Sequence, residues 1–519
     1  MPLNLTALTV FVLFFALVTF VGFAAANWKK GDLDKIHEWG LAGGRFGTLI
    51  TWFLLGGDLY TAYTFIAVPA LAFGAGAVAF FAVPYTIVVY PFVFMVFPRL
   101  WSVARARGYI TAADFVRGRY GDRWLALAIA VTGILATLPY VALQLIGLEV
   151  VIGAMGVQFG GVFVYLPLIL SFSILAAFDF FSGLRAPAAI AIIKDIMIYI
   201  TVFAAVIVIP YELGGWGNIF DKVPREKLLL ADNFGAYTGY ATLFLGSAMA
   251  LFLYPHSVTG VLSSSNRHVI RRNAALLPAY SFLLGLIALL GFMAVAVGVD
   301  KLPAYTAAFQ QYGANFAVPA LFLQVFPSWF VGFAFASIGI GALVPAAIMS
   351  IAAANLFTRN VYREFIAPQC EPRTEAMVAK TSSLVVKVGA LVFIMALPHE
   401  YAIQMQLLGG IWIIHTFPAV VFGLYTRWLD SKALLIGWVV GMMAGTWMAA
   451  SLNFQAIYPV VLFGVTTRVY IAVLSVLLNM GVAAVLTLVF NMSKRAGADE
   501  TMPGDYAVET GPGMGGHGH

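Results

Sequence analysis

The sequence has very little charge and almost no cysteine. Only 10% of its 519 residues are charged, whereas soluble domains carry roughly a quarter. Apolar residues make up 62% of the chain and the mean hydropathy is +0.93, so the polar surface that several soluble domains would need is missing. The one cysteine, Cys370, excludes an internal disulfide framework and any CxxC metal or redox site. These absences indicate a single polytopic membrane protein.

Familiar catalytic motifs are absent as well. The chain contains no HExxH, GxSxG, Walker or CxxCH string, so an integral membrane enzyme is the least favoured class. The net charge of +6 does not indicate nucleic acid, because the basic residues lie in short clusters between apolar runs. The expected partner of these clusters is the lipid bilayer, and no obligatory protein partner is evident.

Apolar runs of about 20 residues, long enough to cross a bilayer as helices, recur along the chain. They predict an all-α fold with thirteen transmembrane helices that begin near residues 3, 46, 77, 124, 163, 187, 237, 274, 329, 379, 405, 433 and 469. The first run, 3–26, ends in three alanines that resemble a signal-peptidase site. It has no basic start, however, and Lys29 and Lys30 follow it, which favours a retained span.

The basic residues predict the orientation. With the N-terminus outside, 24 of the 29 Lys and Arg residues fall on the inside and five fall outside. Thirteen crossings then place the C-terminus in the cytoplasm, with the protein in the inner (plasma) membrane. The tail over 493–519 is rich in glycine and is predicted to be disordered.

One span is interrupted by Gly56, Gly57 and Asp58 near its midpoint. An aspartate at mid-membrane costs about 2.5 to 3.5 kcal/mol on insertion scales, and no Lys or Arg lies within one helical turn of it in the sequence. A bound cation or a proton would offset this cost, so Asp58 is the candidate coupling residue. A hydrogen bond from Asp58 to a neighbouring helix is the structural alternative.

The seventh span carries a second interruption, with Gly246 and Ser247 followed by Pro255. Five spans separate the two interruptions, as in inverted-repeat transporters that hold substrate between unwound helices at the midplane. Glycine packing and a proline kink are the alternative explanation.

Other polar residues inside the predicted spans are harder to assign. Tyr140 and Gln144 lie one turn apart on one helix face and can reach the same cavity, and ordinary packing with a satisfied amide is the alternative. Snorkelling or ion pairing accounts for Lys194, Asp195 and Lys387, so none of these is assigned to substrate.

Several strings resemble the sodium:solute symporter family. They are Gly43-Gly-Arg-Phe-Gly47, the segment 111–121 with Asp114, Arg117 and Arg119, Tyr254-Pro255-His256, and Ala346-Ala347-Ile348-Met349-Ser350, and the resemblance extends from about residue 4 to 490. Within the family, 48–69 and 348–363 resemble bacterial monocarboxylate permeases that carry lactate, pyruvate and related short acids.

The resemblance implies a five-plus-five inverted-repeat core of the amino acid/sodium symporter type, with discontinuous helices. The repeats would occupy 46–210 and 237–425, flanked by the peripheral span 3–26 and two peripheral spans in 433–492.

A sodium ion is the only cofactor that the resemblance implies. Its ligands would be backbone carbonyls of Gly56 and Leu59, together with Ala347 and the hydroxyl of Ser350. Family members commonly carry two adjacent Ser or Thr residues here. One alignment puts this pair at Ser350 and Ile351, and an alignment that counts back from Tyr362 puts it at Val344 and Pro345, so either alignment loses a hydroxyl. Fewer oxygens weaken a sodium site, so proton coupling through Asp58 competes with sodium.

The resemblance also places the substrate, a small organic anion, among tyrosines, an amide and half-helix N–H groups, which can donate hydrogen bonds to a carboxylate. The candidate residues are Tyr60, Tyr63, Tyr140, Gln144, Ser247, Leu251 and Pro255, and none is catalytic. The predicted function is cation-coupled import of a short monocarboxylate. A symporter of proline, acetate or pantothenate and a passive facilitator are the alternatives.

Overall fold

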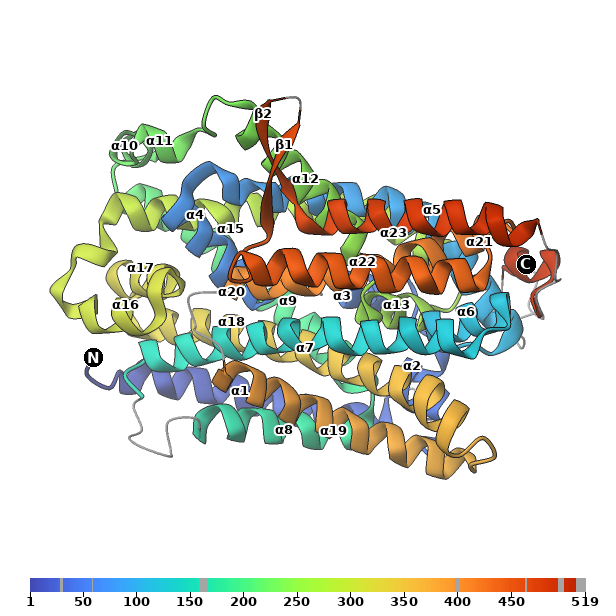
Figure 1. Ribbon diagram of the computed structural model, residues 1–519. Helices are drawn as coiled ribbons and strands as arrows, with labels where there is room; N and C mark the ends of the chain where they lie inside the picture. Colours follow the sequence, from blue (N-terminus) through green and yellow to red (C-terminus); the bar gives the residue numbers. More distant parts are fainter. Residues whose placement is uncertain are drawn as a thin grey trace.

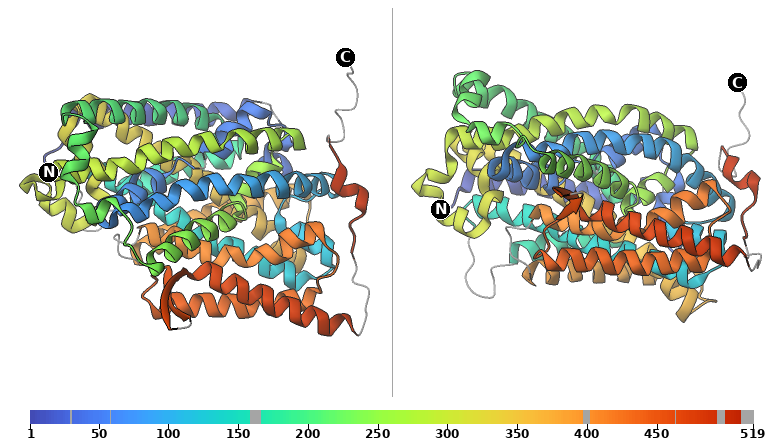
Figure 2. Two further views of the ribbon diagram at one scale, coloured as in Figure 1. Left: turned by 90° about the horizontal axis from the view of Figure 1, so that it is seen from above. Right: turned by 45° about the horizontal axis from the view of Figure 1, so that its top comes forward.

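The computed structural model describes residues 1–28, 31–57, 59–157, 166–396, 402–462, 464–492 and 499–509. Asp58 lies outside the described residues. The fold is a bundle of long helices that run side by side, with the N-terminus and the segment 499–509 at opposite ends (Figures 1 and 2).

The helices follow the apolar runs of the sequence. In chain order the longer ones are α1 (Leu5–Ala24), α3 (Thr48–Gly57), α4 (Val68–Ala75), α5 (Ala82–Arg107), α6 (Ala112–Tyr120), α7 (Arg123–Ala154), α8 (Leu166–Ser182), α9 (Arg185–Glu212), α12 (Phe234–Leu251), α13 (Pro255–Leu262), α14 (Arg267–Leu276), α15 (Pro278–Val297), α17 (Ala317–Val325), α18 (Ser328–Phe357), α19 (Pro372–Ala396), α20 (Ala402–Ile413), α22 (Ser431–Ser451) and α23 (Ile471–Asn491). Short helices α2 (Ile36–Leu41), α10 (Trp216–Lys222), α11 (Arg225–Leu228), α16 (Thr306–Tyr312) and α21 (Gly423–Tyr425) connect them.

Among the described residues, ten helices are long and apolar enough to cross a membrane, and eleven if α12 and α13, bent by 48° at their junction, form one span. Two apolar helices, α3 and α8, are shorter than a full span. The chain is therefore a multi-span membrane protein, and the exact number of thirteen crossings stays a prediction.

The centre of the bundle is formed by α7 and α18. These two helices pack against each other, and α18 also contacts α1, α9 and α19. Nearly all of α18 is buried because its sequence consists almost entirely of small and apolar residues, which allow close approach from every side. Outside this centre, α22 and α23 pack mainly against each other.

A β-hairpin precedes α23, where the sequence predicted only a helix start. Its strands β1 (Ile457–Leu462) and β2 (Val465–Tyr470) are antiparallel, with Ile457 opposite Tyr470. The second strand packs against α12 at the edge of the bundle (Figure 1).

The structure describes residues 499–509 of the glycine-rich tail. This segment forms a short 3₁₀ turn, Pro503–Ala507, across the helix ends (Figure 2). Asp499 pairs with Arg119 at 2.9 Å and Asp505 pairs with Arg107 at 2.6 Å. The composition gave no sign of these partners, because they lie almost 400 residues away in the sequence.

Candidate functional site

The first broken helix separates α3 from α4. α3 ends at Gly57, and the chain becomes helical again in a π-helical turn, Tyr63–Ala67, that leads into α4. In the gap, the backbone N–H of Ala62 donates to Oε1 of Gln144 on α7 at 3.0 Å. Gln144 is fully buried, and its side-chain oxygen satisfies the N–H of Ala62. This N–H is therefore not available to a ligand.

The second broken helix separates α12 from α13. Pro255 begins α13 and lacks a backbone donor, and the Leu251 carbonyl accepts a hydrogen bond from the Ser257 hydroxyl at 3.0 Å. The hydroxyl of Ser247, about one helical turn before the break, is buried and has no hydrogen-bond partner among the described residues. It is a donor available to a ligand.

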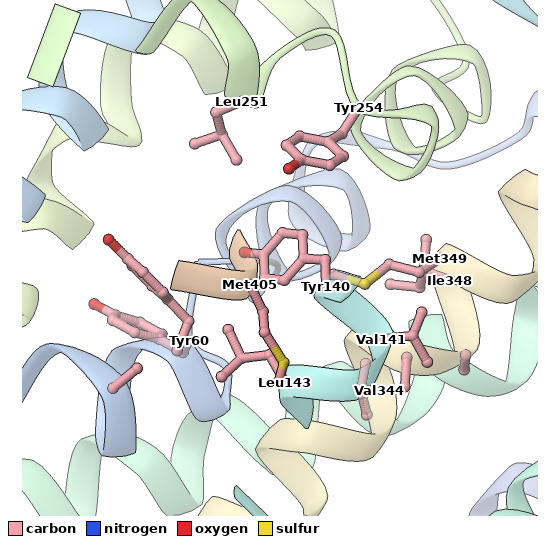
Figure 3. Packing of buried hydrophobic residues seen from close by; sticks show 14 of the residues in the cluster. Tyr60, Tyr140, Val141, Leu143, Leu251, Tyr254, Val344, Ile348, Met349 and Met405 are labelled. Carbon is pink, nitrogen blue, oxygen red and sulfur yellow. The ribbon is translucent and has the colours of Figure 1, made fainter. Parts of the chain in front are cut away.

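Tyrosines fill the interior between the two breaks. Tyr140 of α7 packs against Tyr254 and His256, with ring centroids 5.4 Å and 5.6 Å apart. Figure 3 shows Tyr60, Tyr140 and Tyr254 arriving from three different elements around the same part of the interior. The structure thus brings together the predicted residues of α7 and of the second break. Tyr63 points elsewhere, edge-on against Tyr85 of α5 at 6.3 Å.

A buried lysine lies directly against the first break. Lys194 of α9 is completely buried, and its ammonium donates hydrogen bonds to the carbonyl oxygen of Gly57 and, at 3.3 Å, to that of Tyr60. Nζ also lies 3.2 Å from Oδ1 of the equally buried Asp195. Snorkelling is therefore the wrong explanation for Lys194, and ion pairing is the right one.

The partner of Lys194 is itself held in place. The Tyr280 hydroxyl on α15 donates to Asp195 Oδ2 at 2.9 Å, and the Tyr280 carbonyl accepts from the Tyr60 hydroxyl at 2.9 Å. The rings of Tyr60 and Tyr280 stack with centroids 4.9 Å apart. A continuous network consequently links α3, α9 and α15 around the first break.

The predicted sodium ligands already have internal partners. The Gly56 carbonyl accepts from the Leu59 N–H at 2.9 Å, and the Leu59 carbonyl accepts from the Thr64 hydroxyl. On α18, the Ser350 hydroxyl donates to the Ala347 carbonyl at 2.8 Å. Among the described residues, no group of three His, Cys, Asp or Glu side chains could hold a metal ion.

One residue of α18 that approaches the first break is Gly341, which lies earlier than Ala347. A Cβ atom on Gly341 would lie 3.6 Å from the Tyr60 carbonyl oxygen. Val344 and Pro345, three and four residues further, lie on the same face of the helix and carry no hydroxyl.

Sequence reasoning missed Lys194, Asp195 and Tyr280. It explained the first two by snorkelling or ion pairing and did not single out Tyr280. The predicted span begins near residue 187 and α9 begins at Arg185, so Lys194 lies nine residues, or about 14 Å, along the helix. A lysine and an aspartate side by side at that depth were the signal available in the sequence.

A second buried ion pair joins α8 to α19. Lys387 lies 3.1 Å from Asp179 and donates to the Ser383 hydroxyl at 2.8 Å. Ser383 in turn donates to Ser350 on α18 at 3.3 Å. Ser350 therefore belongs to this second network, and no hydrogen bond of its side chain among the described residues reaches the first break.

An apolar membrane bundle with two broken helices around a buried polar centre is the fold class of secondary transporters with a midplane site. The chain belongs to the sodium:solute symporter family, whose model matches residues 39–445.

Individual relatives agree with this assignment. The monocarboxylate transport permease protein of Rhizobium johnstonii is 52% identical over 492 residues, which are 93% of this chain and 97% of that protein. The uncharacterized symporter YodF of Bacillus subtilis is 34% identical, over 85% of this chain and 87% of its own. A solved Na⁺-coupled sialic acid symporter, in a substrate-bound outward-open state, has the same fold, with a TM-score of 0.74 over 96% of this chain and 99% of that one, at 15% identity.

Proposed function

We propose that the protein is a secondary active symporter that imports a short monocarboxylate, such as lactate or pyruvate, by alternating access. The observation that carries the proposal is that α7 meets both broken helices: Gln144 caps the first at Ala62, and Tyr140, one turn away, packs against Tyr254 at the second. The substrate class is supported by the monocarboxylate permease that shares 52% of its residues with this chain.

Recognition of the carboxylate relies on hydrogen-bond donors around the second break. The proposed donors are the unpartnered hydroxyl of Ser247 and the positive end of α13, which begins at Pro255. His256, packed between Tyr140 and Tyr254, adds an imidazole to this set. A small anion fits such a site without an arginine.

In this proposal the chain makes thirteen crossings in two five-helix repeats. The first contains α3 with α4, then α5, α7, α8 and α9, and the second contains α12 with α13, then α15 with α14, α18, α19 and α20. The N-terminus lies outside and the segment 499–509 in the cytoplasm, which agrees with their positions at opposite ends of the bundle (Figure 1).

The proposed cytoplasmic exit lies beside the second break. A cavity there is lined by residues of α5, α7, α13, α18 and the start of α6, among them Phe97, Thr111, Gly133, Pro255 and Thr259. It leads from Pro255 toward the end of the bundle that carries α6. Rocking of one repeat against the other would open and close this path.

The coupling ion in this proposal is sodium or a proton, with Asp58 as the residue that responds to it. Its motivation is the cost of a mid-membrane carboxylate. The first experiment is uptake of labelled lactate and pyruvate by proteoliposomes under an inward sodium gradient at equal pH, and under a proton gradient without sodium. Accumulation above the outside concentration supports symport, whereas simple equilibration indicates a facilitator.

Two further arms of this experiment sharpen the result. Competition by unlabelled proline, acetate and pantothenate separates the monocarboxylate proposal from other family substrates. Asp58→Asn, inserted normally, is expected to lose gradient-driven accumulation. Unchanged accumulation in that variant would refute the coupling role of Asp58.

A further inference from the structure

The ammonium of Lys194 occupies a position suited to a small cation. Gly57 ends α3 and Tyr60 lies three residues later, inside the helix break, and the carbonyl oxygens of both accept hydrogen bonds from Nζ. Carbonyls at a helix break lack their usual intrahelical partners and can coordinate an ion instead. Here a side chain of the protein satisfies them.

The opposite side of this position offers few further oxygen ligands. Gly341 of α18 faces the Tyr60 carbonyl. Val344 and Pro345 follow on the same helix face, and neither side chain has a hydroxyl. A hard cation needs several oxygen ligands to replace its water shell. An ammonium, by contrast, needs only acceptors for its three N–H groups, and Lys194 has two carbonyls and Asp195.

Charge balance gives an independent argument. Lys194 and Asp195 are both completely buried and lie 3.2 Å apart, so together they form a neutral pair. A sodium ion beside them would add a positive charge next to an ammonium in a poorly solvated region, where like charges repel strongly. The Tyr280 hydroxyl already holds the second carboxylate oxygen of Asp195.

We infer that Lys194 is a built-in cation that takes the place of a sodium ion at the first helix break, and that this position binds no sodium. The residues present therefore do not fit the ion that the family name implies. The inference rests on the proposed symport function and deepens it, since it concerns the coupling ion of the same site.

The test measures sodium binding directly on the purified full-length protein. Radioactive sodium binding and the midpoint of thermal unfolding in sodium chloride and in choline chloride are compared for wild type, Lys194→Ala and Lys194→Arg. Removal of the ammonium frees Asp195 and two carbonyls and vacates space in which water molecules can complete the oxygen ligands of an ion, so Lys194→Ala is expected to gain one bound sodium per chain and a higher midpoint in sodium. Lys194→Arg keeps the charge and should gain neither.

Lys194→Gln, which keeps a side chain of similar length without the charge, replaces the alanine variant if that one does not fold, and Lys387→Ala controls for loss of any buried lysine. A gain of sodium binding confined to the uncharged Lys194 variants supports the inference. No gain in a folded Lys194→Ala or Lys194→Gln variant overturns it.

Uptake by proteoliposomes separates this inference from the proposed function. Accumulation of lactate or pyruvate that needs sodium and saturates with it would contradict the inference and leave the symport function intact. Failure to accumulate any monocarboxylate under either gradient would contradict the proposed function, while the binding result would still decide whether Lys194 excludes sodium.

Discussion

The ammonium of Lys194 on α9 donates a hydrogen bond to the carbonyl oxygen of Gly57, the last residue of α3. A Cβ atom on Gly57 would lie 2.8 Å from Nζ of Lys194 and 3.2 Å from Oδ1 of Asp195. Real Cβ atoms essentially never approach another atom that closely. A side chain at residue 57 would therefore force the ammonium to shift away from its partners.

Substitution of Gly57 by alanine should displace the lysine. We expect Gly57→Ala to destabilise the protein by about 1 to 3 kcal/mol, as is usual when a packed interior is overfilled, and to reduce uptake strongly. Thermal unfolding and lactate uptake measure the two effects. Gly74→Ala, on α4 of the same broken helix, is the matched control, because a Cβ there meets nothing within 4 Å. Equal behaviour of the two variants would show that the close contact is unimportant.

The hydroxyl of Tyr280 is expected to stabilise the buried carboxylate of Asp195. Tyr280→Phe keeps the ring that stacks on Tyr60 but removes the 2.9 Å hydrogen bond. Loss of a hydrogen bond to a charged group should cost about 1.5 to 3 kcal/mol, measured as a lower unfolding midpoint. Tyr425→Phe, which removes a hydrogen bond from an exposed tyrosine to the Met95 carbonyl, should cost less. An equal or larger effect of the control would argue against a special role for Tyr280.

The sequence predicted the helices of this protein better than their contacts. Long apolar runs correspond to helices because their length and composition are local properties, and both glycine- or proline-containing breaks were located from the residues alone. The partner of a buried charge is not a local property. Lys194 lies more than 130 residues from Gly57 in the sequence, and Tyr280 lies 85 residues from Asp195. The network around the first break could not be foreseen without the packing of α3, α9 and α15.

The role of Gln144 was also predicted only in part. Its position one turn from Tyr140 correctly indicated a residue facing the interior, but its carbonyl oxygen caps the N–H of Ala62. Gln144→Ala should leave this N–H unsatisfied and cost about 1 to 3 kcal/mol of stability. Because the cap shapes the break, the variant should also raise the KM for substrate.

Gln404 provides a matched comparison for Gln144. Its side-chain oxygen accepts a hydrogen bond from the Ala456 N–H at 3.1 Å, outside the candidate site. Gln404→Ala should lower the unfolding midpoint in a similar way without changing the KM. If both variants change the KM equally, the effect of Gln144 on uptake is a general consequence of lower stability.

The buried pair of Asp179 and Lys387 offers a prediction about scaffold rather than substrate. Neither oxygen of Asp179 has a hydrogen-bond partner among the described residues, so the ion pair with Lys387 at 3.1 Å is what compensates its burial. Lys387→Met leaves that carboxylate without a countercharge and should cost about 3 to 5 kcal/mol of stability. Asp179→Leu should likewise destabilise the protein, because it leaves Lys387 buried without a countercharge.

Replacement of both residues should restore much of the lost stability, since an apolar pair of similar volume is often as stable as a buried ion pair. A double-mutant cycle on Asp179→Leu and Lys387→Met, followed by thermal unfolding, measures this recovery. Uptake should recover together with stability, because the hydrogen bonds of this network lead from Lys387 through Ser383 to Ser350 and not to either helix break. A double variant that is stable but inactive would instead assign the pair a part in the transport cycle, and the charges of α8 and α19 would then have to change partners as the repeats move.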